Sequence, residues 1–187
     1  MCEYLQYYDL EGYLFRTVSP RFAKHGRLSA FDFFCIVIWK ANRAKSKVAN
    51  KLLAHDHHPD LDAAVQALTV GLTQQPSPKD RLRYLIEEWG LRLPMASAIL
   101  TVLYPSQFTV YDSRVCEQLK CFGDLGSPTK FEHIWPGYER YRQAVEKSAP
   151  RDLSLRDKDR YLWGKSFCEG LRDDIIKRFQ RGAPSEA

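Results

Sequence analysis

The sequence lacks the long apolar run that a membrane-spanning helix requires. Its longest apolar stretch, Phe33 to Trp39, is far shorter than the roughly 20 residues that cross a bilayer. The N-terminal sequence MCEYLQYYDLEGY also lacks the basic and apolar regions of a signal peptide. The cysteines are few, odd in number and unevenly spaced, which disfavours a disulfide framework and indicates a reducing compartment. These absences predict a soluble, intracellular protein that has no membrane partner.

The sequence also lacks the ligand spacings of known metal centres. The five cysteines are scattered along the chain: Cys2, Cys35, Cys116, Cys121 and Cys168. The cluster His55-Asp56-His57-His58 precedes Pro59-Asp60, and adjacent histidines usually point apart. We interpret this cluster as a surface loop that ends at a helix cap, Asp60. No metal and no cofactor is therefore expected.

Length and composition are those of an ordinary globular protein. The 187 residues allow one large domain or two small lobes with a shared core, and a hydrophobic content of 44% is ample for burial. The formal charge of +5 favours an anionic partner without requiring one. The sequence shows no sustained strand-like alternation, no repeats and no low-complexity tracts. The chain is therefore predicted to be all-α.

Helix starts are marked by serines that have an aspartate three positions later. Ser29, Ser77 and Ser154 share this pattern, in which the hydroxyl accepts a bond from a free amide of the first turn. Pro78 and Pro128 at first helical positions support two helix starts, the first of them the one marked by Ser77. The expected helices span residues 29–54, 60–72, 78–89, 94–104, 113–121, 128–147 and 155–180. Residues 181–187 are expected to be a disordered tail, and the first thirty residues give no clear pattern.

The segment from Gly90 to Leu119 carries the most specific pattern in the chain. Gly90 follows a helical run and suits a helix end with positive φ, and Pro94 suits the first turn of the next helix. An apolar helix, a proline-containing loop and Asp112 at the start of another helix follow. Two helices joined in this way present hairpin amides and a helix N-terminus, which together can bind a phosphate.

This segment resembles the helix-hairpin-helix DNA glycosylase superfamily, and it is most similar to small 8-oxoguanine-DNA-glycosylase-like proteins. The family pattern is a hairpin of the type LPGxGxxTA, an apolar helix, and a motif V-D-x-x-V that contains the catalytic aspartate. Residues 90–96 match the hairpin, residues 97–103 the apolar helix, and residues 110–115 the aspartate motif. The resemblance covers about thirty residues, and elsewhere only helix order and length agree.

The resemblance implies a fold of two helical lobes that flank a DNA-binding cleft, within a single glycosylase-like unit of residues 1–180. The central lobe would span about residues 50–120, and the second lobe would combine about residues 1–49 with residues 121–180. The hairpin carbonyls of such a fold can hold a structural monovalent ion. The cysteine pattern of the iron–sulfur members is absent.

Two departures from the family pattern affect the expected chemistry. Arg92 replaces the second hairpin glycine, which adds a cation and removes a flexible amide. Pro94 stands where bifunctional members carry a Schiff-base lysine. The resemblance therefore implies a monofunctional enzyme that leaves an abasic site, unless another lysine substitutes.

Asp112 is the candidate catalytic residue. Cleavage of an N-glycosidic bond builds positive charge on the sugar, so a nearby carboxylate can stabilise the transition state and orient the attacking water. The alternative interpretation is that Asp112 only caps the helix that begins at Ser113, which is worth about 1 kcal/mol. A cap and a catalyst would occupy the same place in the sequence.

The helix that contains Lys40 changes from an apolar half to a cationic half. By the resemblance, Asn42 matches the residue that fills the gap left by the flipped base, and Arg43 and Lys45 contribute to DNA binding. Lys40 could contact the base or a phosphate, or it could replace the missing lysine as a nucleophile. The alternative is that these residues form an ordinary solvated basic face.

The hairpin and a late aromatic pair complete the candidate site. The backbone of Gly90, Leu91, Arg92 and Leu93 is expected to bind DNA phosphates without reading sequence, the alternative being a plain helix-to-helix turn. Trp163 and Phe167 are spaced to lie on one helix face, where they would form a wall for the flipped base. Their alternative role is core packing.

The expected function is a monomeric DNA glycosylase that acts on duplex DNA in base excision repair. It is expected to be cytoplasmic and associated with the nucleoid, or nuclear if the source is a eukaryote. Three alternatives stay open. The chain could be a phage-defence glycosylase that removes hypermodified bases, a non-catalytic helix-hairpin-helix DNA-binding module, or a helical interaction protein unrelated to DNA. A wide polar pocket would favour the defence enzyme over a snug aromatic slot.

Overall fold

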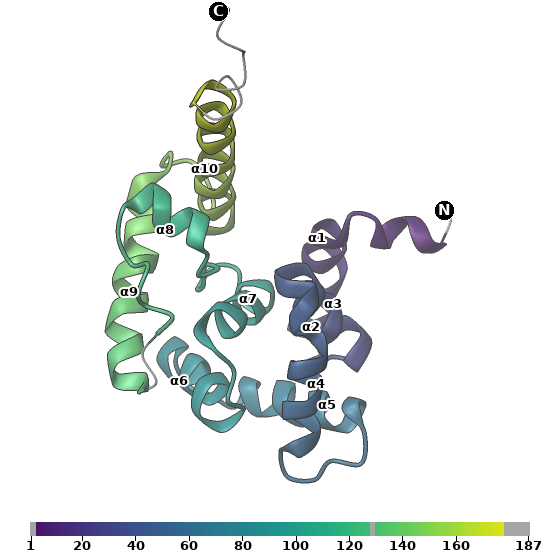
Figure 1. Ribbon diagram of the computed structural model, residues 1–187. Helices are drawn as coiled ribbons and strands as arrows, with labels where there is room; N and C mark the ends of the chain where they lie inside the picture. Colours follow the sequence, from purple (N-terminus) through teal and green to yellow (C-terminus); the bar gives the residue numbers. More distant parts are fainter. Residues whose placement is uncertain (1–2, 128–129, 178–187) are drawn as a thin grey trace, which may run out of the picture.

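The computed structural model describes residues 3–127 and 130–177, and every regular element in these ranges is helical (Figure 1). The all-α prediction is therefore confirmed. Short helical turns are η1 Glu3–Tyr7, η2 Leu14–Val18, η3 Asn42–Ala44 and η4 Tyr84–Glu88. The α-helices are α1 Leu10–Tyr13, α2 Ser19–His25, α3 Ala30–Ala41, α4 Lys45–Ala54, α5 Leu61–Thr73, α6 Pro78–Arg83, α7 Leu93–Leu103, α8 Ser113–Leu119, α9 Phe131–Ser148 and α10 Leu155–Lys177.

Four of the predicted helix starts are confirmed by their side-chain caps, whereas the helix expected from residue 128 begins at Phe131. The side chains of Ser29, Asp60 and Ser77 accept bonds from amides three residues later, at 3.2, 2.8 and 3.2 Å. Ser154 does the same for the amide of Asp157 at 3.1 Å. Pro128, the tail at 181–187 and the last residues of the expected helix 155–180 lie outside the described ranges.

The prediction of one helix over residues 29–54 is wrong. The backbone leaves the helix at Ala41, where φ is −163° and ψ is 87°, and the 3-10 turn η3 follows. A continuous helix would carry its second half away from the core, whereas the break lets α4 pack against both α3 and α5. No residue type marks this break in the sequence, because no glycine or proline lies near it.

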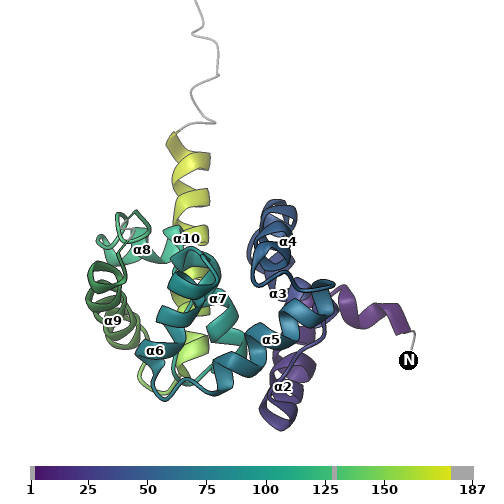
Figure 2. The same cartoon turned by 90° about the horizontal axis from the view of Figure 1, so that it is seen from below.

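Helix α7 is the centre of the fold, because every residue from Met95 to Leu103 is buried. It packs against α2, α3 and α6. Helices α8, α9 and α10 gather on one side of α7, and helices α1 to α5 lie on the other (Figures 1 and 2). The buried apolar side chains form one continuous core cluster. The division into lobes at about residues 50 and 120 stays a prediction.

None of the helices in the described ranges combines the length and the apolar content that a membrane crossing requires.

Candidate functional site

The turn before α7 has the backbone expected of a hairpin. Gly90 has a φ of +61°, and Pro94 lies in the first turn of α7, as predicted. The amide of Leu91 already donates to the carbonyl of Leu85 at 2.9 Å, so it is not free for a phosphate. That part of the prediction is wrong, because the helix end uses this amide to satisfy its own carbonyl. Arg92 is exposed and in an extended conformation immediately before α7.

The carbonyl oxygen of the hairpin glycine, Gly90, accepts a hydrogen bond from a lysine side chain. The Lys51 ammonium on α4 donates a hydrogen bond to the Gly90 carbonyl. Hairpin carbonyl oxygens of this kind could hold a monovalent ion by the resemblance. Here the Lys51 ammonium group is bonded to the Gly90 oxygen instead. The same contact ties the basic helix α4 to the turn that precedes Arg92.

The segment that leads to Asp112 is held by buried hydroxyl groups. The Tyr138 hydroxyl donates to the Thr109 carbonyl at 2.7 Å and accepts from the Thr109 amide at 3.2 Å. The Tyr141 hydroxyl donates to the Val110 carbonyl at 2.8 Å. The Ser97 hydroxyl on α7 accepts from the Tyr111 amide at 2.9 Å. Burial raises the pKa of Tyr141 well above its usual range, so this hydroxyl stays a neutral donor.

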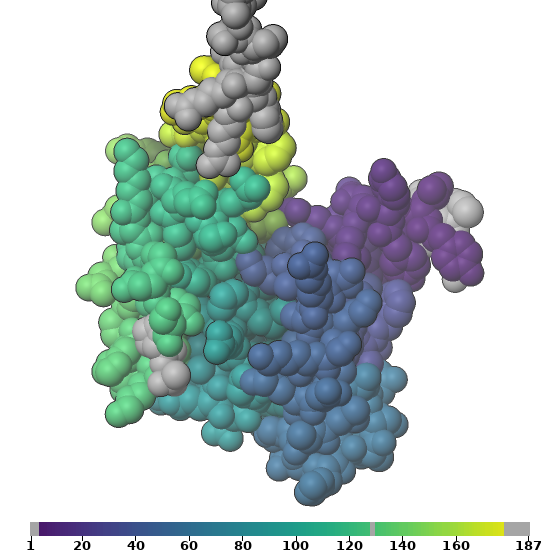
Figure 3. Space-filling model, in the orientation of Figure 1, coloured from purple at the N-terminus to yellow at the C-terminus, as the bar shows by residue number. Residues whose placement is uncertain are grey.

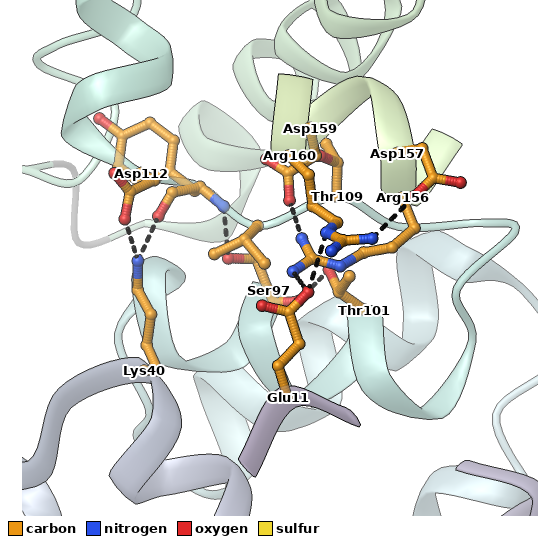
Figure 4. Close-up of polar contacts among 12 residues, drawn as sticks. Glu11, Lys40, Ser97, Thr101, Thr109, Asp112, Arg156, Asp157, Asp159 and Arg160 are labelled. Atoms are coloured by element: carbon orange, nitrogen blue, oxygen red, sulfur yellow. Dashed lines mark hydrogen bonds and ion pairs between the residues drawn. The ribbon is translucent and has the colours of Figure 1, made fainter. Parts of the chain in front are cut away.

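Asp112 makes two contacts with its two carboxylate oxygens. Oδ1 accepts from the Arg114 amide at 3.1 Å, so the residue does cap α8. Oδ2 lies 2.7 Å from Lys40 Nζ, and the same ammonium donates to the Tyr111 carbonyl at 3.3 Å (Figure 4). The side chains of Lys40 and Asp112 are 13% and 24% exposed. The cap therefore leaves one carboxylate oxygen at a partly open surface, beside a cation from a distant helix.

The Lys40–Asp112 pair lies between two cavities. One has a volume of about 530 Å³ and the other of about 670 Å³, and both residues line each of them. The surface is notched between α10 and the N-terminal segment, where residues of both line the first cavity (Figure 3). The first cavity is otherwise lined by Glu11, Trp39, Val110, Arg156, Asp159, Arg160 and Trp163.

A network of charged residues forms one wall of the first cavity. The Arg156 guanidinium donates to Asp159 and lies 2.7 Å from Glu11 Oε1, which also pairs with Arg160 at 3.2 Å (Figure 4). Asp159 is 3% exposed. Burial raises its pKa to about 6, against the opposing effect of the Arg156 guanidinium. Sequence reasoning missed this network, because Glu11 is 145 residues away from Arg156 and carries no motif.

The predicted aromatic pair is a surface feature. The rings of Trp163 and Phe167 are stacked with centroids 5.8 Å apart and an interplanar angle of 6°. Each residue is 43% exposed, which contradicts the alternative of core packing. Trp163 lines the first cavity, whereas Phe167 does not. The Arg114 guanidinium lies 5.3 Å from the Trp163 ring centroid and 5.7 Å from that of Phe167, next to the cap of α8.

Asn42, Arg43 and Lys45 are exposed at the break between α3 and α4. Asn42 Oδ1 accepts a bond from Lys45 Nζ at 3.4 Å, and none of the three lines either cavity. They lie on the chain just after Lys40, so the break turns this polar group away from the core. The structure thus joins Lys40, Asp112 and Trp163 around one cavity. In the hairpin only Gly90 and Arg92 are exposed, and they lie outside this cavity, as do the exposed residues Asn42, Arg43 and Lys45.

Comparisons with protein-family models, with curated proteins and with solved structures found no significant match. The function is therefore inferred from the residues and the geometry of this chain.

Proposed function

We propose that the protein is a DNA glycosylase, which flips a modified base out of the duplex and hydrolyses its N-glycosidic bond. The observation that carries the proposal is the Lys40–Asp112 pair. Its carboxylate oxygen and ammonium group lie 2.7 Å apart at a partly exposed point shared by two cavities. The turn at Gly90 to Leu93, in which Gly90 and Arg92 are exposed and the two leucines are buried, precedes the buried helix α7, whose C-terminal exit leads to Asp112.

Asp112 would act through its charge and through Oδ2, the oxygen that the α8 cap does not use. As the base departs, positive charge develops on the deoxyribose, and a fixed carboxylate lowers the energy of that state. A water bound by Oδ2 would attack C1′ as the bond between C1′ and the base nitrogen breaks. The Asp112 carboxylate would take the proton of this water and pass it to the departing base, which leaves an abasic site and a free base. Ser97, Tyr138 and Tyr141 support the proposal, because they fix the segment before Asp112 and reduce the reorganisation that catalysis would need.

DNA would be held by backbone contacts that ignore sequence. The Arg92 side chain and the amides of Arg92 and Leu93 at the start of α7 would bind phosphate, and the exposed Asn42, Arg43 and Lys45 would lie near the gap in the duplex. The contact between Lys51 and Gly90 supports a shared surface, because it ties α4 to the hairpin. The excess of basic residues suits a phosphate-rich partner.

The lining of the first cavity favours a polar base as the substrate. Trp39 and Trp163 offer aromatic walls, and Glu11, Arg156 and Asp159 offer groups that can form hydrogen bonds with a base edge. With a volume of about 530 Å³ and this many charged groups in its lining, the cavity is wider and more polar than an aromatic slot. This lining favours the second candidate, a glycosylase that removes hypermodified bases in phage defence.

The test is cleavage of end-labelled duplexes that carry oxidised, alkylated, deaminated or hypermodified bases, with and without hot alkali. Strand breaks that appear only after alkali identify a monofunctional glycosylase and name its substrate. Breaks without alkali, together with a borohydride-trapped complex that disappears in Lys40→Arg, would make Lys40 the nucleophile that replaces the missing hairpin lysine. The absence of base release from every duplex, with salt-sensitive binding retained, would establish a non-catalytic DNA-binding module.

A further inference from the structure

The loop between α4 and α5 brings two histidines and an aspartate together. Asp56 and His57 have φ values of +48° and +49°, and this left-handed turn folds the chain back on itself. One potential ligand atom from each of His55, Asp56 and His58 lies within 4.8 Å of the others. His55 and His58 are three positions apart rather than adjacent, and across this turn their rings lie 6.1 Å apart and nearly parallel.

One ring nitrogen of each histidine in this cluster is buried and lacks a hydrogen bond. Nδ1 of His55 and Nε2 of His58 are both inaccessible to water and form no hydrogen bond with any described residue. His55 Nδ1 lies 3.2 Å from Asp56 Oδ2, but the contact lacks hydrogen-bond geometry. Buried ring nitrogens normally have partners, so two such atoms beside one carboxylate point to a missing ligand.

Trp89 holds the two imidazole rings in nearly parallel planes. The His55 ring stacks on the Trp89 ring with centroids 3.9 Å apart and planes at 15°. The His58 ring lies 6.0 Å from Trp89, at 6° to its plane. Stacking reduces the freedom of both rings before any ligand binds, so less entropy is lost on binding.

The charge around the cluster suits a cation. The adjoining hollow of about 520 Å³ is lined by Asp56, Asp80 and Glu88, together with a single cation, Arg83. The Arg83 guanidinium is neutralised by its own neighbours, at 3.8 Å from Asp80, 3.7 Å from Glu87 and 3.2 Å from Glu132. The described part of this wall is therefore acidic overall.

We propose that His55, Asp56 and His58 form a binding site for a divalent transition-metal ion of the zinc class. Two imidazoles and one carboxylate are a donor set that such ions accept, with the fourth position left for a water from the hollow. Ligand bonds of about 2.0–2.2 Å require the three atoms to approach one another slightly. The exposed Asp56 side chain, at 77% exposure, is free to make that movement. The ion would fix this loop on Trp89, one residue before Gly90.

The test is Zn²⁺ titration of the untagged, chelator-treated chain, followed by calorimetry or equilibrium dialysis. His57→Asn is the matched control, because it changes the same loop by the same substitution and asparagine tolerates the left-handed backbone. We expect one ion per chain and an affinity that falls more than about 100-fold in His58→Asn, since even second-layer changes cost about 10–100-fold. His57→Asn should bind as the wild type does.

Equal Zn²⁺ binding by His57→Asn and His58→Asn would overturn the proposal, and so would the absence of stoichiometric binding by the wild type. If His58→Asn fails to fold, as judged by circular dichroism without metal, Asp56→Asn decides the question. This substitution also suits a positive φ, and it removes only the carboxylate charge. Unchanged affinity in Asp56→Asn would then refute the site, whereas a loss of at least about tenfold would support it.

Discussion

Two sets of charged residues line the first cavity, the Lys40–Asp112 pair and the Arg156 network. They differ in burial and in the number of hydrogen-bond partners. The Lys40–Asp112 pair joins residues 72 positions apart, and its carboxylate is 24% exposed. The Arg156 network is drier, because the Asp159 side chain is 4% exposed and Arg156 bonds to both Asp159 and Glu11. A buried group with several fixed partners is costly to move. Under the proposed function, we therefore expect Asp159 to support the site and Asp112 to carry the chemistry.

The largest expected effect that tests this comparison is loss of base release in Asp112→Asn. Asparagine also caps helices well, so α8 should persist, whereas the negative charge is lost. The rate of base release should fall by about 10²–10³-fold, as for other groups that stabilise charge in a transition state. Single-turnover base release measures the rate, and duplex affinity should stay within a few-fold of the wild type.

The matched control for Asp112→Asn is Asp60→Asn, because Asp60 caps α5 in the same way, with its carboxylate 2.8 Å from the Ala63 amide. Equal loss of activity in both variants would show that Asp112 acts only as a cap, and would remove the contrast between the two charged groups.

The next effect in size is on stability, in Asp159→Asn. Burial raises the folded-state pKa of Asp159 to about 6 from a usual 3.8, so the folded chain holds more protons than the unfolded chain between these values. The contribution of Asp159 to stability therefore falls as the pH rises from about 4 to about 6, by up to about 3 kcal/mol. Urea unfolding at several pH values should show that the free energy of unfolding of the variant increases relative to that of the wild type as the pH rises across this window.

Asp157→Asn is the control for this pH effect. The Ser154 hydroxyl lowers the pKa of Asp157, so its contribution is present above pH 4 and is lost as the pH falls. The variant should therefore lose stability relative to the wild type as the pH rises, although only slightly, because Asp157 is partly exposed. A stability difference between Asp159→Asn and the wild type that does not change with pH would show that burial does not raise the pKa of Asp159 in the folded chain.

A smaller effect separates two roles of Lys40. If the ammonium only holds Asp112, Lys40→Arg keeps a cation near the carboxylate and should lower the rate of base release about tenfold, or about 1.4 kcal/mol. Lys40→Gln should lower it further. If Lys40 is a nucleophile, Lys40→Arg abolishes alkali-independent strand cleavage completely, because a guanidinium cannot form the Schiff base. Measurement of both products in both variants distinguishes the roles.

The sequence predicts the local parts of this site better than their assembly. The serine and aspartate caps, the positive φ of Gly90 and the start of α7 follow from short-range chemistry, and the structure has all of them. The break after Ala41 depends instead on where α4 finds a packing surface, and no residue type marks it.

The partners of the candidate residues were outside the reach of sequence reasoning for the same reason. The sequence suggested Asp112 and Lys40 separately, but their 2.7 Å contact depends on the packing of α3 against α7. Glu11 lies in a segment without a clear pattern, and it meets Arg156 only because α1 and α10 both line the cavity. Side-chain clusters from distant segments are properties of the tertiary fold.

The smallest expected effect concerns the support beneath Asp112, in Tyr141→Phe. The substitution removes a buried donor from the Val110 carbonyl, two residues before Asp112, at a cost of about 1–2 kcal/mol in unfolding free energy. If this hydroxyl positions Asp112, the rate of base release should fall a few-fold while the Michaelis constant stays unchanged. Tyr138→Phe, which loses the bonds to Thr109 one residue earlier, should cost similar stability with a smaller effect on the rate. Equal rates in the two variants would mean that residues 109–112 move as a rigid unit. The position of the Asp112 carboxylate would then be set by Lys40 and by the α8 cap.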